Sequence, residues 1–265
     1  YTNYIAKWCM NYAIEIGEWL SEKHTEVFKA KCVAWDLDPQ VEFKEWSKRA
    51  DNMHLPSLEG TNVFLQQDGF MDKEQLFASD LSSSDRPINQ NWSWDRILRS
   101  VFIKQADVLQ GLYFFGDDFS REQLEDNFDF YEPRTVHESS LSPCVHSVLA
   151  AKLGKVDKAY EMYLRTSRLD LDDYNQEIHE GLHITSMAGT WMSVVEGFGG
   201  FSVLNGVPHF STLIPKQWQS YTFRILFRDR LLRITVNNQD AEVVLESGLD
   251  LHVVLNDKEI ELTAR

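Results

Sequence analysis

The sequence has few cysteines, more acidic than basic residues and no long apolar run. Its three cysteines, Cys9, Cys32 and Cys144, are odd in number and lack paired metal-ligand spacing, which argues against a disulfide framework and favours a reducing cytoplasm. The net charge of -15 argues against nucleic acids and anionic membranes as partners. No stretch reaches transmembrane length, and no signal peptide opens the chain.

The motifs of several common enzyme classes are also missing. We find no G-x-S-x-G, no Walker loop, no GxGxxG before a helix and no HExxH. Acidic residues are abundant but form no evident acid/base pair. The composition, 43% hydrophobic and 25% charged over 265 residues, is that of a soluble globular protein. Because the chain starts without Met inside a helical pattern, we expect it to be a fragment of a longer protein.

Helical patterns dominate the first three quarters of the chain. Apolar residues from Tyr4 to Leu20 recur at helical spacing, and Asp38-Pro39 is typical of a helix start. Residues 55–91 read as irregular. Helices joined in pairs by short loops favour an α/α toroid. We predict further helices over 103–115, after a capping box of Ser120 and Gln123, from Ser142-Pro143 to Gly154, over 156–165 and over 181–197.

The pattern changes near Gly206. Tyr221, Phe223 and Ile225 alternate with polar residues, a second alternating run covers 232–236, and two short apolar runs follow. This predicts an antiparallel β domain over residues 206–265, after a helical domain over 1–205. A β domain of this size is marginal alone, so we expect it to share an interface with the helices.

Three separated segments could together bind an anion. Ser139 and Ser140 precede the helix predicted at Ser142, whose free N–H groups favour negative charge. Lys104 and Gln105, predicted to open a helix, offer a positive charge and a partner for a sugar hydroxyl. His183 could complete a phosphate site. Residue spacing alone favours the structural alternatives, serines that only cap a helix and turn a loop and a core histidine, and it also allows a solvated lysine.

Six ordered stretches carry a resemblance to a known family. They span nearly the whole chain, and Gly181–Trp191 is the strongest of them. They are YTNY (1–4), NQNWSWD (89–95), FIKQADV (102–108), FYEPRTVHESSLS (130–142), DLDDYN (170–175) and GLHITSMAGTW (181–191). With them the chain resembles glycoside hydrolase family 65, the family of maltose, trehalose, kojibiose and nigerose phosphorylases.

The resemblance implies a fold and a location for the catalytic acid. It implies the C-terminal part of an (α/α)6 catalytic barrel followed by a small antiparallel β-sandwich. The family's general acid is a Glu in a G-P-D-E-Y-type motif, expected just upstream of Tyr1. We therefore expect no catalytic acid within these residues.

The resemblance also implies a reaction. The upstream acid would protonate the glycosidic oxygen, and inorganic phosphate would attack the anomeric carbon from the opposite face, with inversion. By resemblance, Ser139, Ser140, His183 and Lys104 bind phosphate, and Lys104 with Gln105 lines the sugar side. Phosphate is a co-substrate, and no metal or organic cofactor is expected. The expected products are β-glucose 1-phosphate and glucose, and the expected assembly is a homodimer.

Several alternatives stay open at this level. Maltose is the favoured disaccharide because DLDDYN and LHITSMAGTW look most like maltose-specific members, but trehalose, nigerose and kojibiose are alternatives. The chain could also be a non-catalytic carbohydrate- or partner-binding module, which the sequence upstream of Tyr1 would reveal. A family hydrolase that uses water is a third reading, and phosphate dependence of activity would decide it.

Overall fold

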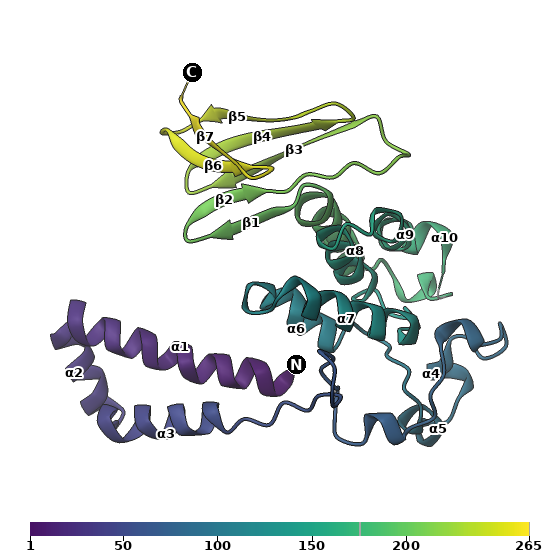
Figure 1. The fold of residues 1–265 in the computed structure, drawn as a ribbon, viewed down its shortest axis with the longest axis horizontal. Coiled ribbons are helices and arrows are strands. Elements are labelled where there is room, and N and C mark those ends of the chain that lie inside the picture. Colours follow the sequence, from purple (N-terminus) through teal and green to yellow (C-terminus); the bar gives the residue numbers. More distant parts are fainter. Residues whose placement is uncertain (175, 265) are drawn as a thin grey trace. The chain divides into compact units, whose positions relative to one another are not determined.

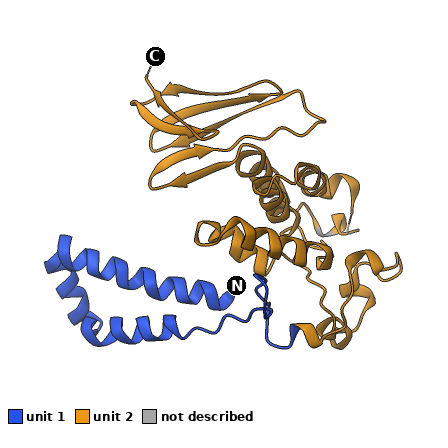
Figure 2. Ribbon diagram, in the orientation of Figure 1, with its two compact units in different colours: residues 1–70 blue, residues 71–265 orange. Residues whose placement is uncertain are grey.

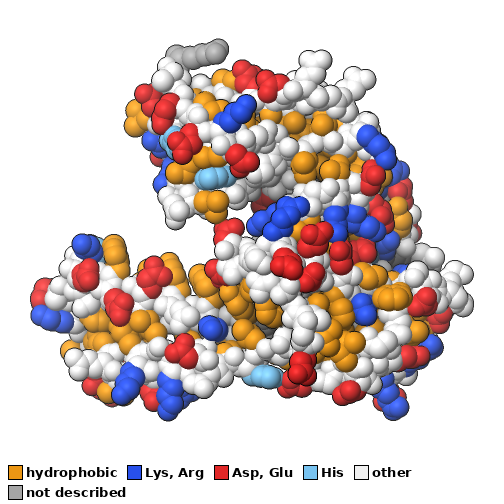
Figure 3. Space-filling view, viewed as in Figure 1, with side chains coloured by type: hydrophobic (Ala, Val, Ile, Leu, Met, Phe, Trp, Pro, Cys, Tyr) orange, Lys and Arg blue, Asp and Glu red, His pale blue; other side chains and the backbone are white. Residues whose placement is uncertain are grey.

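The computed structural model describes residues 1–174 and 176–264, which divide into two compact units. Unit 1 covers residues 1–70 and unit 2 covers residues 71–265 (Figure 2). Within the described residues, no helix combines the length and apolar character needed to cross a membrane. Acidic and basic side chains are interspersed on the face shown in Figure 3.

Unit 1 is a set of three helices, α1 (Thr2–Lys23), α2 (Thr25–Ala34) and α3 (Pro39–Asp51) (Figure 1). The predicted start of α3 is confirmed, since the Gln40 N–H donates to the Asp38 carboxylate at 3.0 Å. Helix α1 packs on α3 at Gly17, where a Cβ atom would lie only 2.3 Å from the Phe43 ring. A side chain at this position would push the two helices apart.

The helical part of unit 2 is built around α8 (Pro143–Lys152), which is buried from Pro143 to Ala151. Helices α6, α9 and α11 and the π-helix η6 pack against it. The bounds are η1 Phe70–Asp72, η2 Ala78–Asp80, α4 Ile88–Asn91, α5 Trp94–Arg99, α6 Val108–Phe114, η3 Gly116–Asp118, α7 Arg121–Tyr131, η4 Glu132–Arg134, α9 Val156–Ser167, α10 Leu169–Asp172, η5 Ile178–Glu180, α11 Ile184–Met192 and η6 Ser193–Phe198.

Most helix predictions are confirmed, but the helix predicted over 103–115 is confirmed only over Val108–Phe114, and its predicted start is wrong. Its first residues are extended, because the Ile103 N–H donates to the Arg134 carbonyl and the Ile103 carbonyl accepts from the Val136 N–H. Helix α6 starts only at Val108, after Asp107 with a φ of 44°. Lys104 and Gln105 therefore lie in an exposed bend and do not open a helix.

The C-terminal region is a sandwich of two sheets, with strand orders β1-β2-β6-β7 and β3-β4-β5. The predicted β tail is confirmed, with two refinements. Strand β1 already starts at Phe201, ahead of the boundary placed at residue 206, and β2 pairs with β6 in parallel. The strands are β1 Phe201–Leu204, β2 Val207–Phe210, β3 Ser220–Phe227, β4 Arg230–Asn237, β5 Ala241–Ser247, β6 Leu251–Leu255 and β7 Lys258–Leu262.

The sandwich core has the alternation seen in the sequence. Leu232, Ile234 and Val236 of β4 are buried, while the residues between them are partly exposed. Where the sandwich meets the helices, the ring centroids of Trp218 and of Phe198 in η6 lie 5.0 Å apart. The Trp218 ring also meets the Tyr163 ring of α9 edge-on at 5.2 Å. These aromatic contacts form the interface expected between the β domain and the helices.

Candidate functional site

The serine pair lies in the short loop that leads into α8, residues 137–142, which we call the serine loop. Both Ser139 and Ser140 are partly exposed, and the Leu141 N–H donates to Ser139 Oγ at 3.3 Å. The predicted helix start is confirmed with Ser142 at the N-cap position of α8, but its hydroxyl bonds to His137 Nδ1 at 2.8 Å and makes no capping hydrogen bond. The serine hydroxyls thus come just before a helix start whose own first residues are buried.

His183 sits at the start of α11 and is oriented by carboxylates. Its Nδ1 lies 2.6 Å from Asp170 Oδ1, and its backbone N–H donates to Asp170 Oδ2 at 2.9 Å. Its Nε2 lies 3.8 Å from Glu177 Oε2. The bonds from His183 lower the pKa of the Asp170 carboxyl. This is a partly exposed, oriented imidazole, and it is not the apolar core histidine that was the alternative.

A hydroxyl contact brings the serine loop to the start of α11. Ser140 Oγ and Thr185 Oγ1 lie 3.0 Å apart, and Thr185 follows His183 by two positions. Helix α11 is held on the helices behind it, because Ser186 Oγ donates to the Thr166 carbonyl at 2.8 Å. Segments some forty-five residues apart in the sequence therefore meet at this point.

Lys104 follows a segment that pairs with the chain leading to the same loop. The extended segment at Ile103 runs parallel to the chain at Thr135, which continues toward the serine pair. The Lys104 charge acts on the carboxylate of Glu138, the residue before Ser139. Gln105 is the exposed neighbour of Lys104. The proposed phosphate ligands thus lie on adjoining segments, and their joint binding of phosphate stays a prediction.

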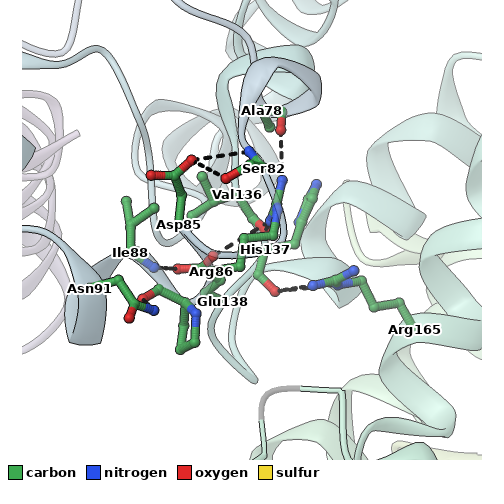
Figure 4. Close-up of polar contacts among 11 residues, drawn as sticks. Ala78, Ser82, Asp85, Arg86, Ile88, Asn91, Val136, His137, Glu138 and Arg165 are labelled. Atoms are coloured by element: carbon green, nitrogen blue, oxygen red, sulfur yellow. Dashed lines mark hydrogen bonds and ion pairs between the residues drawn. The ribbon is translucent and has the colours of Figure 1, made fainter.

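A group of charged residues behind the serine loop was missed in the sequence. Glu138 is only 4% exposed; its carboxylate accepts from the Ile88 N–H at 2.7 Å and pairs with Arg86 at 3.5 Å (Figure 4). Arg165 of α9 donates to the His137 carbonyl through Nη2 at 2.7 Å and Nε at 3.2 Å. The sequence held one signal, a Glu next to the serine pair, but nothing that indicated its partners.

The electrostatics at this loop differ from those of the chain as a whole. Burial raises the pKa of Glu138, while the Ile88 N–H and the charges of Arg86 and Lys104 act to lower it. Burial, and next the like charge of Arg86, lower the pKa of Arg165. The positive charges of Arg86, Lys104 and Arg165 thus all act on one carboxylate, in a chain with a net charge of -15. Such a local positive cluster is what an anion requires in an acidic protein.

No group of metal-ligating side chains is found in the part of the chain that the structure describes. In the DLDDYN stretch, Asp170 and Asp172 have clear partners, His183 and Arg168. Asn175, the last residue of that stretch, lies outside the described residues. The donor groups at the site are hydroxyls, an imidazole, guanidinium groups and an ammonium group, which suit oxyanions, and the carboxylates of Asp170, Glu177 and Glu138 lie beside them.

Comparison with known proteins places these features in a family. Residues 1–192 match the glycosyl hydrolase family 65 central catalytic domain, and residues 201–262 match the C-terminal domain of that family. A helical catalytic part followed by a β-sandwich is thus the arrangement of these two domains. The chain belongs to glycosyl hydrolase family 65.

Individual relatives are disaccharide phosphorylases. The chain is 44% identical to maltose phosphorylase of Bacillus subtilis (strain 168), over 100% of this chain and 34% of the relative. It is 35% identical to an alpha,alpha-trehalose phosphorylase of Thermoanaerobacter brockii, over 99% of the chain and 34% of the relative. It spans about a third of the length of these relatives.

A solved structure shares the fold. The protein named "Putative kojibiose phosphorylase from human microbiome" superposes with a TM-score of 0.89 at 35% identity. The match covers 100% of this chain and 36% of that one. It agrees with the expectation of part of an (α/α)6 barrel followed by a β domain.

Proposed function

We propose that this chain is part of an inverting phosphorylase that cleaves maltose with inorganic phosphate to β-glucose 1-phosphate and glucose. Maltose is favoured because identity to the maltose phosphorylase is 44%, against 35% and 36% for a trehalose and a kojibiose phosphorylase. Trehalose, kojibiose and nigerose are the alternative substrates. The observation that carries the proposal is the contact of Ser140 with Thr185, which joins the serine loop to the start of α11.

In the proposed site, Ser139, Ser140, His183 and Lys104 bind phosphate, and Lys104 and Gln105 line the sugar side. Hydroxyl and imidazole donors combined with a point charge suit an oxyanion, and Arg86 and Arg165 add positive potential. Phosphate held here would attack the anomeric carbon on the face opposite the leaving oxygen. The proton for that oxygen would come from a Glu outside these residues.

The test is an assay of glucose 1-phosphate release by the full-length protein with phosphate and, in turn, maltose, trehalose, kojibiose and nigerose. We expect release from maltose at the highest kcat/KM. The 265-residue chain assayed beside it should be inactive, because the general acid, typically worth about 100- to 10,000-fold, is expected elsewhere. Fragment turnover near the full-length rate would refute that assignment.

The same assay separates the competing functions. A hydrolase would release glucose without phosphate, and a binding module would show no turnover even at full length. The positive charges around the serine loop favour phosphate over water as the nucleophile. Homodimer formation and a cytoplasmic location stay predictions, to be tested by light scattering and by cell fractionation.

A further inference from the structure

The backbone just before the serine pair has an uncommon conformation. His137 is buried and has a φ of 55°, in the left-handed region that non-glycine residues seldom adopt. Such a backbone persists only where surrounding contacts hold it. The His137 side chain bonds through Nδ1 to the Ser142 hydroxyl at 2.8 Å, and Ser139 and Ser140 lie between these two residues in the chain. The serine loop is thus closed on itself across its own ends.

Arg165 holds the carbonyl of the same residue. Its Nη2 and Nε both donate to the His137 carbonyl oxygen, at 2.7 Å and 3.2 Å. The guanidinium carbon also lies 5.1 Å from the centre of the Tyr174 ring, over its face. A planar guanidinium can give two bonds in a fixed orientation, which an ammonium group cannot.

The next residue of the loop, Glu138, is anchored through its own side chain to a different segment. Its buried carboxylate accepts from the Ile88 N–H and pairs with Arg86. Arg86 is itself fixed by donating to the carbonyls of Val136 at 3.2 Å and Ala78 at 2.7 Å. Figure 4 shows Arg165 and the Arg86–Ile88 segment meeting the loop from different elements. Two consecutive residues before Ser139 are therefore anchored to separate parts of unit 2.

We propose that Arg165 and Glu138 are positioning residues that set the serine pair for phosphate. The inference rests on the proposed function of this loop. Neither residue needs to touch phosphate. Arg165 fixes the His137 carbonyl, Glu138 is itself anchored through its carboxylate to the Ile88 N–H and Arg86, and Ser139 and Ser140 follow directly in the chain. Displacing a reacting group by about 1 Å can cost about 100-fold in rate, so loosening either anchor should affect phosphate use.

The experiment uses the full-length protein with R165K and E138Q. R165K keeps the charge but not the two-pronged bond, and E138Q keeps an acceptor for Ile88 but loses the charge paired with Arg86. We expect the KM for phosphate to rise about 10- to 100-fold in each variant, with the KM for disaccharide within about twofold of wild type. The Tm should stay close enough to wild type for assay.

The matched control is R121K. Arg121 also clamps backbone carbonyls, those of Leu153 at 2.6 Å and Lys152 at 3.2 Å, but at the opposite end of α8 from the serines. Both KM values should be unchanged in R121K. If R165K and E138Q raise both KM values equally, or lower only the Tm, their role is structural and the inference is wrong. If wild type shows no phosphate-dependent release, the proposed function itself fails.

Should R165K not fold, E138Q tests the inference alone, because the two anchors act on adjacent residues. Thermal shift with inorganic phosphate provides a second readout. Wild type should gain Tm with phosphate, and E138Q should gain markedly less at the same concentration. An equal gain would overturn the inference.

Discussion

The β-sandwich and the helices behind the serine loop are held together by different interactions. In the sandwich, the buried positions are almost all apolar, with Leu232, Ile234 and Val253 fully buried. At the serine loop, Glu138 and His137 are buried, and each has a hydrogen-bond partner. Apolar burial stabilises without demanding particular partners, whereas each buried polar group needs a specific one. The first region provides stability, and the second fixes geometry.

The sharpest test of this comparison is His183→Ala in the full-length protein. Removing one donor that stabilises charge typically costs about 100- to 1000-fold in kcat, and we expect that loss in phosphorolysis. The Tm should change little, because His183 is partly exposed. The control is His252→Ala, which removes another carboxylate-paired histidine, bonded to Glu261 at 2.7 Å in the sandwich. Full activity of His183→Ala would remove it from the site.

Ile234→Ala tests the opposite side of the comparison. The side chain is fully buried in the sandwich core, and truncation should lower the free energy of unfolding by about 2 to 5 kcal/mol. Chemical denaturation with a matched Ile234→Val variant, expected to cost about 0.5 to 1.5 kcal/mol, would measure it. Activity per folded molecule should be unchanged. A loss of activity without a loss of stability would show that the sandwich also shapes the site.

A third prediction concerns His146, which is fully buried in α8. Neither ring nitrogen has a hydrogen-bond partner among the described residues, and burial holds its pKa well below the usual value. The unfolded chain therefore binds a proton below about pH 6.5 that the folded chain does not, so stability is lost as pH falls. The contribution approaches about 1.4 kcal/mol per pH unit.

His146→Leu should remove this pH dependence. Unfolding curves between pH 7 and pH 5 should be flatter for His146→Leu than for wild type. Equal slopes in wild type and His146→Leu would mean that His146 binds protons alike in the folded and unfolded chain, and would contradict the prediction. The test shows whether the polar region behind the loop weakens the protein in acid.

The two regions also differ in how far the sequence predicts them. Alternation at Tyr221, Phe223 and Ile225 gave the correct strand β3, because side-chain period and burial are local properties of a sheet. The Glu138 network was missed because its partners are distant, with fifty positions between Ile88 and Glu138. The wrong helix start at Ile103 has the same cause, a backbone pairing with Arg134 and Val136 that overrides the local pattern.

The smallest expected effect is that of Tyr221→Phe, which removes a polar tie between the sandwich and the helices. The Tyr221 hydroxyl lies 2.6 Å from the Phe198 carbonyl oxygen and 2.8 Å from that of Leu213. One such hydrogen bond contributes about 0.5 to 1.5 kcal/mol, well below the cost expected for a large core side chain. Tyr160→Phe is the control, since its ring packs on Trp218 at 6.0 Å and no hydrogen bond of its hydroxyl is found within the described residues. Chemical denaturation should show a larger loss in the free energy of unfolding for Tyr221→Phe than for Tyr160→Phe, and a smaller loss than for Ile234→Ala. If Tyr221→Phe cost as much as Ile234→Ala, the sandwich would depend on polar ties as strongly as the serine loop does, and the contrast between the two regions would fail.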